Sequence, residues 1–378
     1  MAEHAEAAPR IPLRAYRVVR YLPLALGATA VAFVLAYVLF IAEPPPATGN
    51  GTWRTTTFGS AVDDPSSFFR TVLDSVTFAA LLFIVASGFT LIFGLMRVVN
   101  MAHGSFFLLG GYIALKLQRY FVGEASYLGL TSDQVSAANW ILPLLIATTC
   151  IAVVGLVMQQ LFLRWNQGQD LRQALITIAI SIIAADQILA HFVQGGSADI
   201  AYPDFIGPDK RLDFGFGGIV YSWSRLFTLF VAIGIGLALW LWLHRTRTGM
   251  IIRAGVDDRA MVSALGINVQ LVFAIAFLVG AALAGFGGVI GGSSAGLDVG
   301  VDGNWLLNSL VVVIIGGMGS LAGAAVGALL YAFVDQFAAI YLPSIGGNCC
   351  TQYSSILTFA LLAVVLAVRP YGLFGRPT

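Results

Sequence analysis

Long apolar runs recur from Tyr21 to Val368, and several approach the ~20 residues that an α-helix needs to cross a bilayer core. Only 10% of the 378 residues are charged, whereas soluble domains carry about 25%. Because a backbone surrounded by lipid must satisfy its own hydrogen bonds, such runs predict membrane helices. The chain is therefore predicted to be an all-α, polytopic membrane protein.

About ten membrane spans are expected. They lie at 21–41, 72–93, 101–118, 140–163, 174–193, 225–243, 271–292, 304–316, 320–340 and 354–369. The first run is longer than the ~7–15 apolar residues of a signal peptide, which favours a retained anchor helix. The run 304–316 is short enough to be a half-helix rather than a full crossing. We expect residues 1–71 to form a cytoplasmic N-terminus, the anchor helix and an extracytoplasmic insertion (42–70), and residues 72–378 to form the transmembrane domain.

The distribution of Lys and Arg indicates the orientation, because these residues accumulate in cytoplasmic loops. With the N-terminus inside, most of the 20 Lys and Arg residues fall on the cytoplasmic side. An even number of spans then places both termini in the cytoplasm.

The chain shows no nucleotide site of its own. A P-loop requires Gly-Lys followed by Ser or Thr, because that lysine reaches the phosphates. The two lysines, Lys116 and Lys210, follow Leu115 and Asp209 instead. If ATP drives this protein, another subunit binds the nucleotide, and no cofactor is expected in this chain. The net charge of +1 and the lack of a long basic patch argue against nucleic-acid binding.

The segment 244–268 is the long loop between spans on the expected cytoplasmic side. Residues Asp257 to Met261 have the pattern of a helix start, with acids where the N-terminal dipole favours them. Gly266 then provides a helix stop. A short exposed helix here would fit a soluble partner protein. On the pattern alone, a solvated loop that follows the positive-inside rule is equally consistent.

Polar residues inside membrane spans are functional candidates, because burying them is costly. Asn100 and His103 lie in a turn between two apolar runs, which we expect near the cytoplasmic face. In one interpretation Asn100 caps the next helix, and the exposed N–H groups attract the carboxylate of a passing substrate. The favoured alternative is structural: His103 bonds to the backbone, and Gly104 permits close packing.

A second set of polar residues lies toward the outer side of two spans. Its members are Asp186, Gln187, His191, Asp335 and Gln336. They line an outward-facing vestibule in one interpretation. In the other they hold helices together or contact a second permease subunit.

Glycines at intervals of four, such as Gly287/Gly291, suit close helix crossings. The sequence Gly316-Gly317-Met318-Gly319 interrupts two apolar runs and is expected to form a hinge or re-entrant turn. The hinge and packing candidates are Gly316, Gly317, Gly319 and Gly323.

Four stretches in the same order resemble bacterial branched-chain amino-acid ABC permeases. They are Gly88–Ala114, Thr246–Ile290, Val311–Leu330 and Val368–Gly375, and the resemblance covers roughly residues 72–376. Ser105 departs from the pattern, since many relatives carry an acidic residue there. The extension 1–71 lies outside the part that matches.

The resemblance implies the fold of a type II ABC importer permease in a bacterial inner membrane. It implies a second permease subunit, two ATPase subunits that bind ATP, and an extracytoplasmic binding protein as partners. It also implies that residues 257–266 dock into an ATPase. The residues expected to couple to the ATPase are Arg253, Asp257, Asp258, Arg259, Met261 and Gly266. The implied cargo is a branched-chain or other hydrophobic amino acid.

Two other functions are also consistent with the sequence. Permeases for urea or short amides look similar around Asn100-Met101-Ala102-His103-Gly104. A stand-alone secondary transporter or channel is a hypothesis of a different class, and it would transport without an ATPase. An enzyme has little support, because the sequence shows no metal-ligand cluster and no nucleophile–base pair.

Overall fold

The computed structural model describes residues 65–96, 99–123, 135–192, 198–207, 209–213, 220–257, 259–341 and 353–375. The expected anchor helix 21–41 lies outside the described residues, and so do Asp258 and nearly all of the insertion that follows the anchor.

The helices of the described part agree with the apolar runs. They are α3 (Pro65–Met96), α4 (His103–Gly123), α5 (Ala137–Met158), the π-helical turn η2 (Gln159–Leu163), the 3-10 turn η3 (Arg164–Asn166), α6 (Asp170–His191), α7 (Trp223–Arg245), α8 (Arg247–Asp257), α9 (Arg259–Ala264), α10 (Val269–Ser294), α11 (Val301–Gly316), α12 (Leu321–Tyr341) and α13 (Tyr353–Val368). Each span expected between residues 72 and 369 is confirmed as a helix, with ends shifted by a few residues.

Six of the described helices are long and apolar enough to cross a membrane, namely α3, α5 with its η2 and η3 extension, α6, α7, α10 and α12. α11 and α13 are apolar but shorter. α4 has 21 residues and carries Lys116 and Arg119 near its end. The prediction of an all-α membrane protein is confirmed. A short antiparallel hairpin of β1 (Arg211–Asp213) and β2 (Val220–Ser222) is the exception among the described residues.

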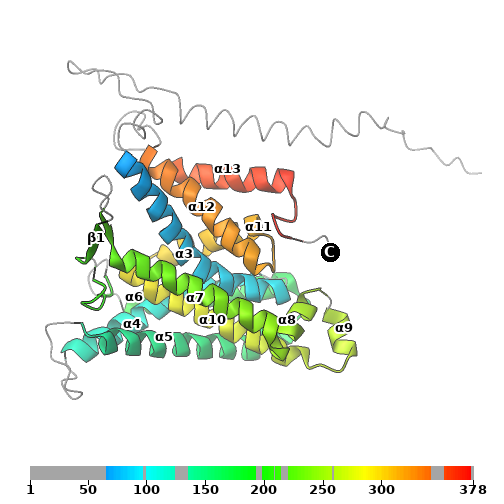
Figure 1. Cartoon of the computed structure of the whole chain (residues 1–378). Coiled ribbons are helices and arrows are strands. Elements are labelled where there is room, and N and C mark those ends of the chain that lie inside the picture. Colours follow the sequence, from blue (N-terminus) through cyan, green and yellow to red (C-terminus); the bar gives the residue numbers. More distant parts are fainter. Residues whose placement is uncertain are drawn as a thin grey trace, which may run out of the picture.

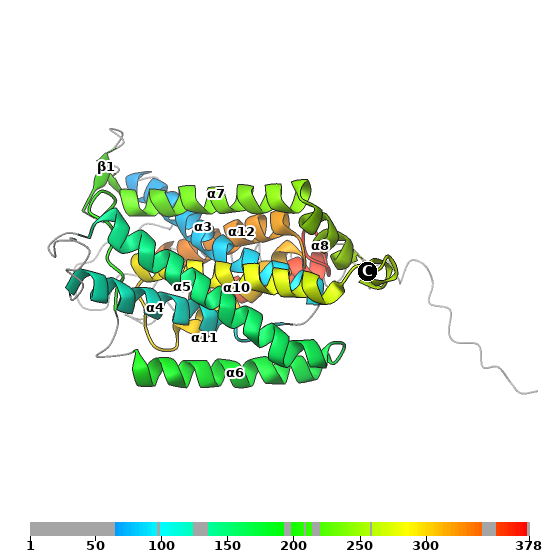
Figure 2. The same ribbon diagram turned by 90° about the horizontal axis from the view of Figure 1, so that it is seen from below.

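Most helices run between two ends of one bundle (Figures 1 and 2). One end carries α8 and α9, and we call it the α8–α9 end. The opposite end carries the β1–β2 hairpin, and we call it the hairpin end. α3 crosses the bundle diagonally, and α6 lies along one side of it (Figure 2).

α10 lies at the centre and contacts α3, α4 and α5 through glycines. A Cβ at Gly280 would lie 2.7 Å from the carbonyl oxygen of Gly88 in α3, and one at Gly285 would lie 2.8 Å from Cβ of Ile151 in α5. A Cβ at Gly288 would collide with the Phe107 carbonyl oxygen of α4. Small residues let membrane helices approach closely and gain van der Waals contact, which explains the density of glycine in this helix.

At the hairpin end, the segment that includes Ala198 to Ile206 packs over the helix ends. Gln118 of α4 holds it by two hydrogen bonds: its amide donates to the Ala201 carbonyl (2.8 Å), and its side-chain oxygen accepts from the Ala201 N–H (3.0 Å). Trp140 of α5 stacks on Tyr202, with ring centroids 6.2 Å apart. The backbone of this irregular segment is thereby covered by protein, as non-helical chain near a membrane requires.

The central helix gives a direct test of glycine packing. We expect Gly288→Ala to lower the melting temperature of the purified permease by about 5 °C, because overpacking costs about 1–3 kcal/mol. Gly234→Ala is the matched control, since a Cβ there meets nothing within 4 Å. The control should be neutral or stabilising, because alanine favours a helix by about 1 kcal/mol over glycine. Equal melting temperatures for both variants would contradict this account of α10.

Candidate functional site

The loop between α7 and α10 forms two helices rather than one. Thr246 caps α8, because its hydroxyl oxygen accepts the N–H of Gly249 at 3.1 Å. α8 ends at Asp257, and α9 begins at Arg259. The helix start predicted within Asp257 to Met261 is therefore confirmed, since α9 begins at Arg259, whereas α8 was not predicted. The apolar residues Ile252 and Val256, spaced one helical turn apart, are the sequence signal that could have revealed α8.

α9 ends where the sequence pattern predicts. Gly266 adopts a left-handed conformation, with φ of 77°. Its N–H donates to the Ser263 carbonyl at 3.0 Å, and the N–H of Leu265 donates to Met261 at 3.1 Å. A glycine just beyond the last helical residue satisfies orphan carbonyls in this way.

α8 and α9 differ in how far they are buried. Ile252 of α8 is 2% exposed and belongs to an apolar cluster with Leu95 of α3 and Phe273 of α10. On α9 and just after it, Met261 is 62% exposed and Leu265 is 70% exposed. Arg253 is also exposed. The pair of helices is thus anchored to the bundle through α8 and presents apolar side chains outward through α9.

Three segments meet at what we call the glycine junction: Gly94 of α3, Val256 of α8 and Gly319 of the turn between α11 and α12. A Cβ at Gly94 would lie 2.8 Å from the Gly319 Cα and 3.6 Å from a Val256 methyl group. A Cβ at Gly319 would lie 3.1 Å from the other Val256 methyl group. A cavity of about 40 Å³ adjoins the junction, and Ser87, Arg253 and Val256 are among the residues that line it.

The turn that contains Gly319 is tied to the C-terminal segment. Gly317 and Gly319 adopt positive φ angles of 102° and 80°. The N–H groups of Leu373 and Phe374 donate to the carbonyls of Ile315 and Gly316, both at 2.9 Å. The turn is therefore covered by protein, which a break in a membrane helix requires.

Gly316 and Gly323 hold α11 against α12. A Cβ on either glycine would collide with the carbonyl oxygen of the other. The two helices that flank the turn are consequently in backbone contact next to the junction.

The turn at Asn100 and His103 lies deeper in the bundle than expected. His103 is fully buried, and its Nε2 is 3.0 Å from the Val85 carbonyl oxygen of α3. Val85 lies about three helical turns before the end of α3 at Met96. The start of α4 therefore lies well inside the bundle, about three helical turns from the end of α3, a depth that the sequence did not indicate.

The surroundings of this turn favour its structural interpretation. The Val85 carbonyl can only accept, so Nε2 of His103 donates. The ring also meets Phe89 edge-on at 5.2 Å. Asn100 accepts the N–H of Ala102 at 3.1 Å, as a capping residue does. A Cβ at Gly104 would collide with the carbonyl oxygen of Asp302.

The second set of polar residues does not form one vestibule within this chain. Asp186, Gln187 and His191 are exposed on α6, whereas Asp335 and Gln336 are half-buried on α12. The two helices lie on different sides of the bundle (Figure 2). The sequence placed these residues toward the outer side of two spans but carried no signal of which way each helix face turns.

Ser105, which departs from the family pattern, links α4 to α6. Its hydroxyl lies 2.8 Å from the Ser181 hydroxyl. A short polar side chain thus takes part in packing at this position.

The family described as branched-chain amino acid transport system / permease component matches residues 71–366. The chain belongs to this family. The LivH high-affinity branched-chain amino acid permease protein of Salmonella typhimurium is 27% identical over 320 residues, covering 82% of this chain and 96% of that protein. The BraD protein of Pseudomonas aeruginosa is 27% identical over 313 residues with the same coverage.

A more distant relative is the probable branched-chain amino acid permease LivH of Methanocaldococcus jannaschii, at 26% identity over 80% of this chain and 90% of that protein. A chain in the solved structure of PsaBC from Streptococcus pneumoniae in complex with Fab is 14% identical. It covers 81% of this chain and 94% of its own length, with a TM-score of 0.42, a value too low to establish a shared fold.

Three of the four stretches that resemble the branched-chain permeases meet at the glycine junction, and the fourth contacts the same α11–α12 turn two residues away. Gly94, Val256 and Gly319 come from the first three stretches. Gly372 comes from the fourth, and a Cβ there would lie 2.6 Å from the Gly317 Cα. The sequence placed these motifs in order along the chain, but their meeting point was not foreseen. A glycine facing another glycine leaves no hydrophobic pattern by which to find it.

A structural role for His103 predicts that its loss destabilises the permease. We expect His103→Ala to lower the melting temperature by about 5 °C or more, because it leaves a cavity and removes a buried hydrogen bond. His191→Ala is the matched control, since His191 is exposed and bonds only within α6, to Gln187. We would measure thermal unfolding of the purified permease. An unchanged melting temperature for His103→Ala would overturn the structural assignment.

Proposed function

We propose that this chain is the membrane-spanning subunit of an ATP-driven importer that translocates branched-chain or other hydrophobic amino acids. The observation that supports it most is the glycine junction, where three of the four stretches that resemble the family connect the α8–α9 end to the bundle core. Family membership supplies the class of transporter.

In this proposal α8 and α9 form the contact with an ATPase subunit, which binds the ATP. Met261 and Leu265 are the apolar anchors, because large exposed apolar side chains at a bundle end mark a protein interface. Arg253, Asp257, Asp258 and Arg259 are the further candidates for this contact that the resemblance implies. α8 is fixed to α3 and α10 by the apolar cluster around Ile252. A movement of α9 caused by the ATPase is therefore transmitted to the bundle.

The glycine junction then passes the movement to the transmembrane helices. One methyl group of Val256 lies beside Gly319 and the other beside Gly94, so a shift of α8 acts on the α11–α12 turn and on α3 together. The adjoining cavity of about 40 Å³ leaves room for a small displacement of Val256. The glycines of the turn tolerate changes of backbone angle that other residues resist. Gly316, Gly317, Gly319 and Gly323 are accordingly the hinge between α11 and α12.

The remaining partners follow from this orientation. The α8–α9 end faces the cytoplasm, where both termini lie, in a bacterial inner membrane. A substrate-binding protein docks on the hairpin end, and a second permease subunit completes the pathway. α6 is mostly exposed and carries Asp186, Gln187 and His191, which suit a contact with that second subunit.

Docking through α9 can be tested by changing its apolar anchors. We expect the double variant Met261→Asp and Leu265→Asp to reduce the ATPase that co-purifies with the permease at least tenfold. ATP-dependent leucine uptake into vesicles should fall in parallel. Val299→Asp, an exposed position at the opposite end, is the matched control and should retain the ATPase.

Uptake that needs ATP and prefers leucine over urea would support the proposed cargo. ATP-dependent uptake of urea would contradict the proposed cargo but would still support the proposal of an ATP-driven importer. Uptake that continues without ATP or an ATPase subunit would contradict the proposal and would favour a stand-alone transporter.

A further inference from the structure

The chain turns from α5 into α6 at the α8–α9 end of the bundle (Figure 2). We call η3 (Arg164–Asn166) and the first turn of α6 the α5–α6 corner. Amide groups hold this corner in place. The side-chain amide of Gln173 in α6 donates to the Asn166 carbonyl oxygen at 2.7 Å. Gln167 and Gln270 of α10 form two reciprocal hydrogen bonds, at 2.8 and 3.0 Å. The corner therefore presents its side chains on a fixed backbone.

Two exposed arginines of this corner have no acidic partner in the described part of the chain. The Arg164 guanidinium lies over the Trp165 ring, 6.0 Å from its centroid. Arg172 of α6 reaches the same turn, with its Nη1 3.5 Å from the side-chain oxygen of Asn166. Asp170 is exposed in the first turn of α6 but pairs with neither arginine. Two positive charges and one negative charge thus meet at the corner and leave one net positive charge.

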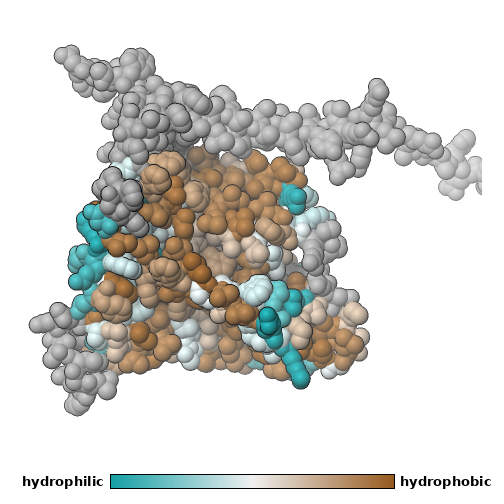
Figure 3. Space-filling model, viewed as in Figure 1, coloured by the Kyte–Doolittle hydropathy of each residue, from teal (hydrophilic) through white to brown (hydrophobic). Residues whose placement is uncertain are grey.

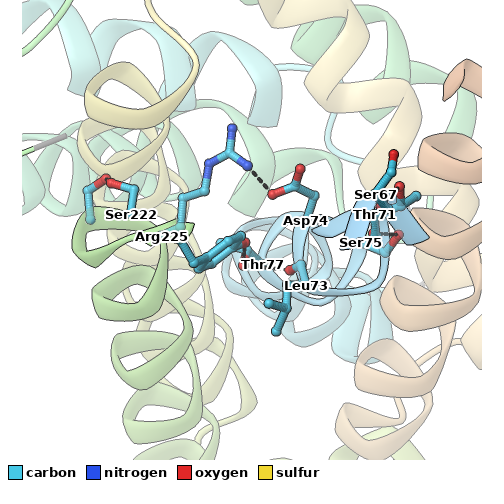
Figure 4. A network of polar contacts seen from close by, with 10 residues as sticks. Ser67, Thr71, Leu73, Asp74, Ser75, Thr77, Ser222 and Arg225 are labelled. Carbon is cyan, nitrogen blue, oxygen red and sulfur yellow. Dashed lines mark hydrogen bonds and ion pairs between the residues drawn. The ribbon is translucent and has the colours of Figure 1, made fainter. Parts of the chain in front are cut away.

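An arginine at the opposite end of the bundle shows the contrasting arrangement. Arg225 of α7 pairs with Asp74 of α3 (Figure 4). Its guanidinium also lies 5.7 Å from the centroid of the Tyr221 ring. The charge of Arg225 is thus compensated within the chain. The net charge of the α5–α6 corner is not, so it attracts a negative group from outside the chain.

The length of α5 places the corner at the level of the lipid headgroups. α5 with η2 and η3 is one apolar span of 30 residues. At about 1.5 Å per residue it is about 45 Å long, whereas the hydrocarbon core of a bilayer is about 30 Å thick. Trp165 at its end is 78% exposed, and tryptophan is enriched at the membrane–water boundary. In Figure 3 the visible face of the bundle is hydrophobic between its two ends, as a lipid-facing surface requires.

An exposed apolar stripe on α5 leads to the corner. Val154, Val157 and Leu161 are spaced three and four residues apart and are 41%, 46% and 61% exposed. Residues at this spacing share one face of a helix. The stripe offers an aliphatic surface that ends at the positive charges of the corner.

We propose that the α5–α6 corner is a binding site for an anionic phospholipid. Arg164 and Arg172 bind the headgroup phosphate, and Trp165 lies beside the glycerol region. An acyl chain follows the stripe along α5. This inference goes beyond the proposed function, because it requires neither the cargo nor ATP.

The chemistry of the corner selects an anionic lipid over a zwitterionic one. Guanidinium groups form charge-assisted, often bidentate hydrogen bonds with phosphate. Phosphatidylglycerol presents this phosphate with a net negative charge. In phosphatidylcholine the choline cation offsets the phosphate and is repelled by the two arginines. Asp170 opposes the binding of any anion here, so it limits the preference.

The test measures which lipid lies beside the stripe. The permease, with Cys150, Cys349 and Cys350 changed to Ser, carries a bimane fluorophore on Val157→Cys. In phosphatidylcholine vesicles, a rising fraction of the lipid is replaced by brominated phosphatidylglycerol or, in parallel, by brominated phosphatidylcholine, which quench an adjacent fluorophore. We expect phosphatidylglycerol to be preferred about fivefold, the effect of one net charge at a membrane surface. Leu145→Cys, exposed in the half of α5 nearer the hairpin end, is the matched control and should show no preference.

Charge variants identify the headgroup contact. The double variant Arg164→Gln and Arg172→Gln should bring the preference at Val157→Cys close to one. Asp170→Asn should raise it, because a negative charge beside the phosphate is removed. Arg119→Gln, an exposed arginine near the end of α4, is the matched control and should leave the preference unchanged. Equal quenching by brominated phosphatidylcholine in all variants shows that each is inserted in the same way.

Several outcomes would overturn the inference. The first is a preference near one without charge variants, and the second is a preference that persists in the double variant. Glycerol phosphate that abolishes the preference would mean that the corner binds a phosphate group rather than a lipid. Absence of quenching by both brominated lipids would mean that protein covers the stripe.

A salt titration keeps the test decisive if the double variant does not insert. The preference at Val157→Cys should fall toward one when KCl is raised from about 0.1 M to about 1 M, because salt screens exposed charges. A preference that does not change with salt would contradict binding through the arginines. None of these measurements involves leucine or ATP, so the inference can fail while the proposed function stands.

Discussion

The close approach of helix backbones through glycine is the constraint on which the rest of this structure depends. In lipid there is no hydrophobic force between helices, so they associate by van der Waals contact and hydrogen bonds. α10 meets α3, α4 and α5 at glycines, and a single Cβ at Gly288 would force α4 away. Because α4 carries the buried His103 and α3 carries Gly94, this packing sets the position of the glycine junction.

The same type of contact links the two ends of the bundle. At the α8–α9 end, Gly319 lies so close to Val256 and Gly94 that a Cβ on it would be 3.1 Å from a Val256 methyl group and 3.3 Å from the Gly94 Cα. From there α3 runs to the hairpin end, where Asp74 meets Arg225. One helix thus takes part in the contact proposed for coupling and in an ion pair toward the opposite end. A change at one end is therefore able to alter the other without a chain of separate side-chain movements.

The sequence was sufficient to predict where the helices lie along the chain, but not how they pack against one another. Apolar runs predicted every span of the described part, because length and hydropathy are local properties. Gly266 was predicted as a helix stop, because a left-handed residue favours glycine. The depth of His103, the start of α8 and the outward position of Asp186 depend on how helices pack, which periodicity does not encode. The meeting of Gly94, Val256 and Gly319 joins segments far apart in the chain, and glycine leaves no apolar signal to reveal it.

The central claim is that Val256 transmits movement of α8 to the transmembrane helices. The most direct measurement is the amount of leucine taken up per ATP hydrolysed by the complete transporter in vesicles, for wild type and Val256→Ala. Val154→Ala, on the exposed face of α5, is the matched control. The account predicts that Val256→Ala retains its ATPase partner and hydrolyses ATP but takes up several-fold less leucine per ATP than the control. An unchanged ratio in Val256→Ala would contradict the account.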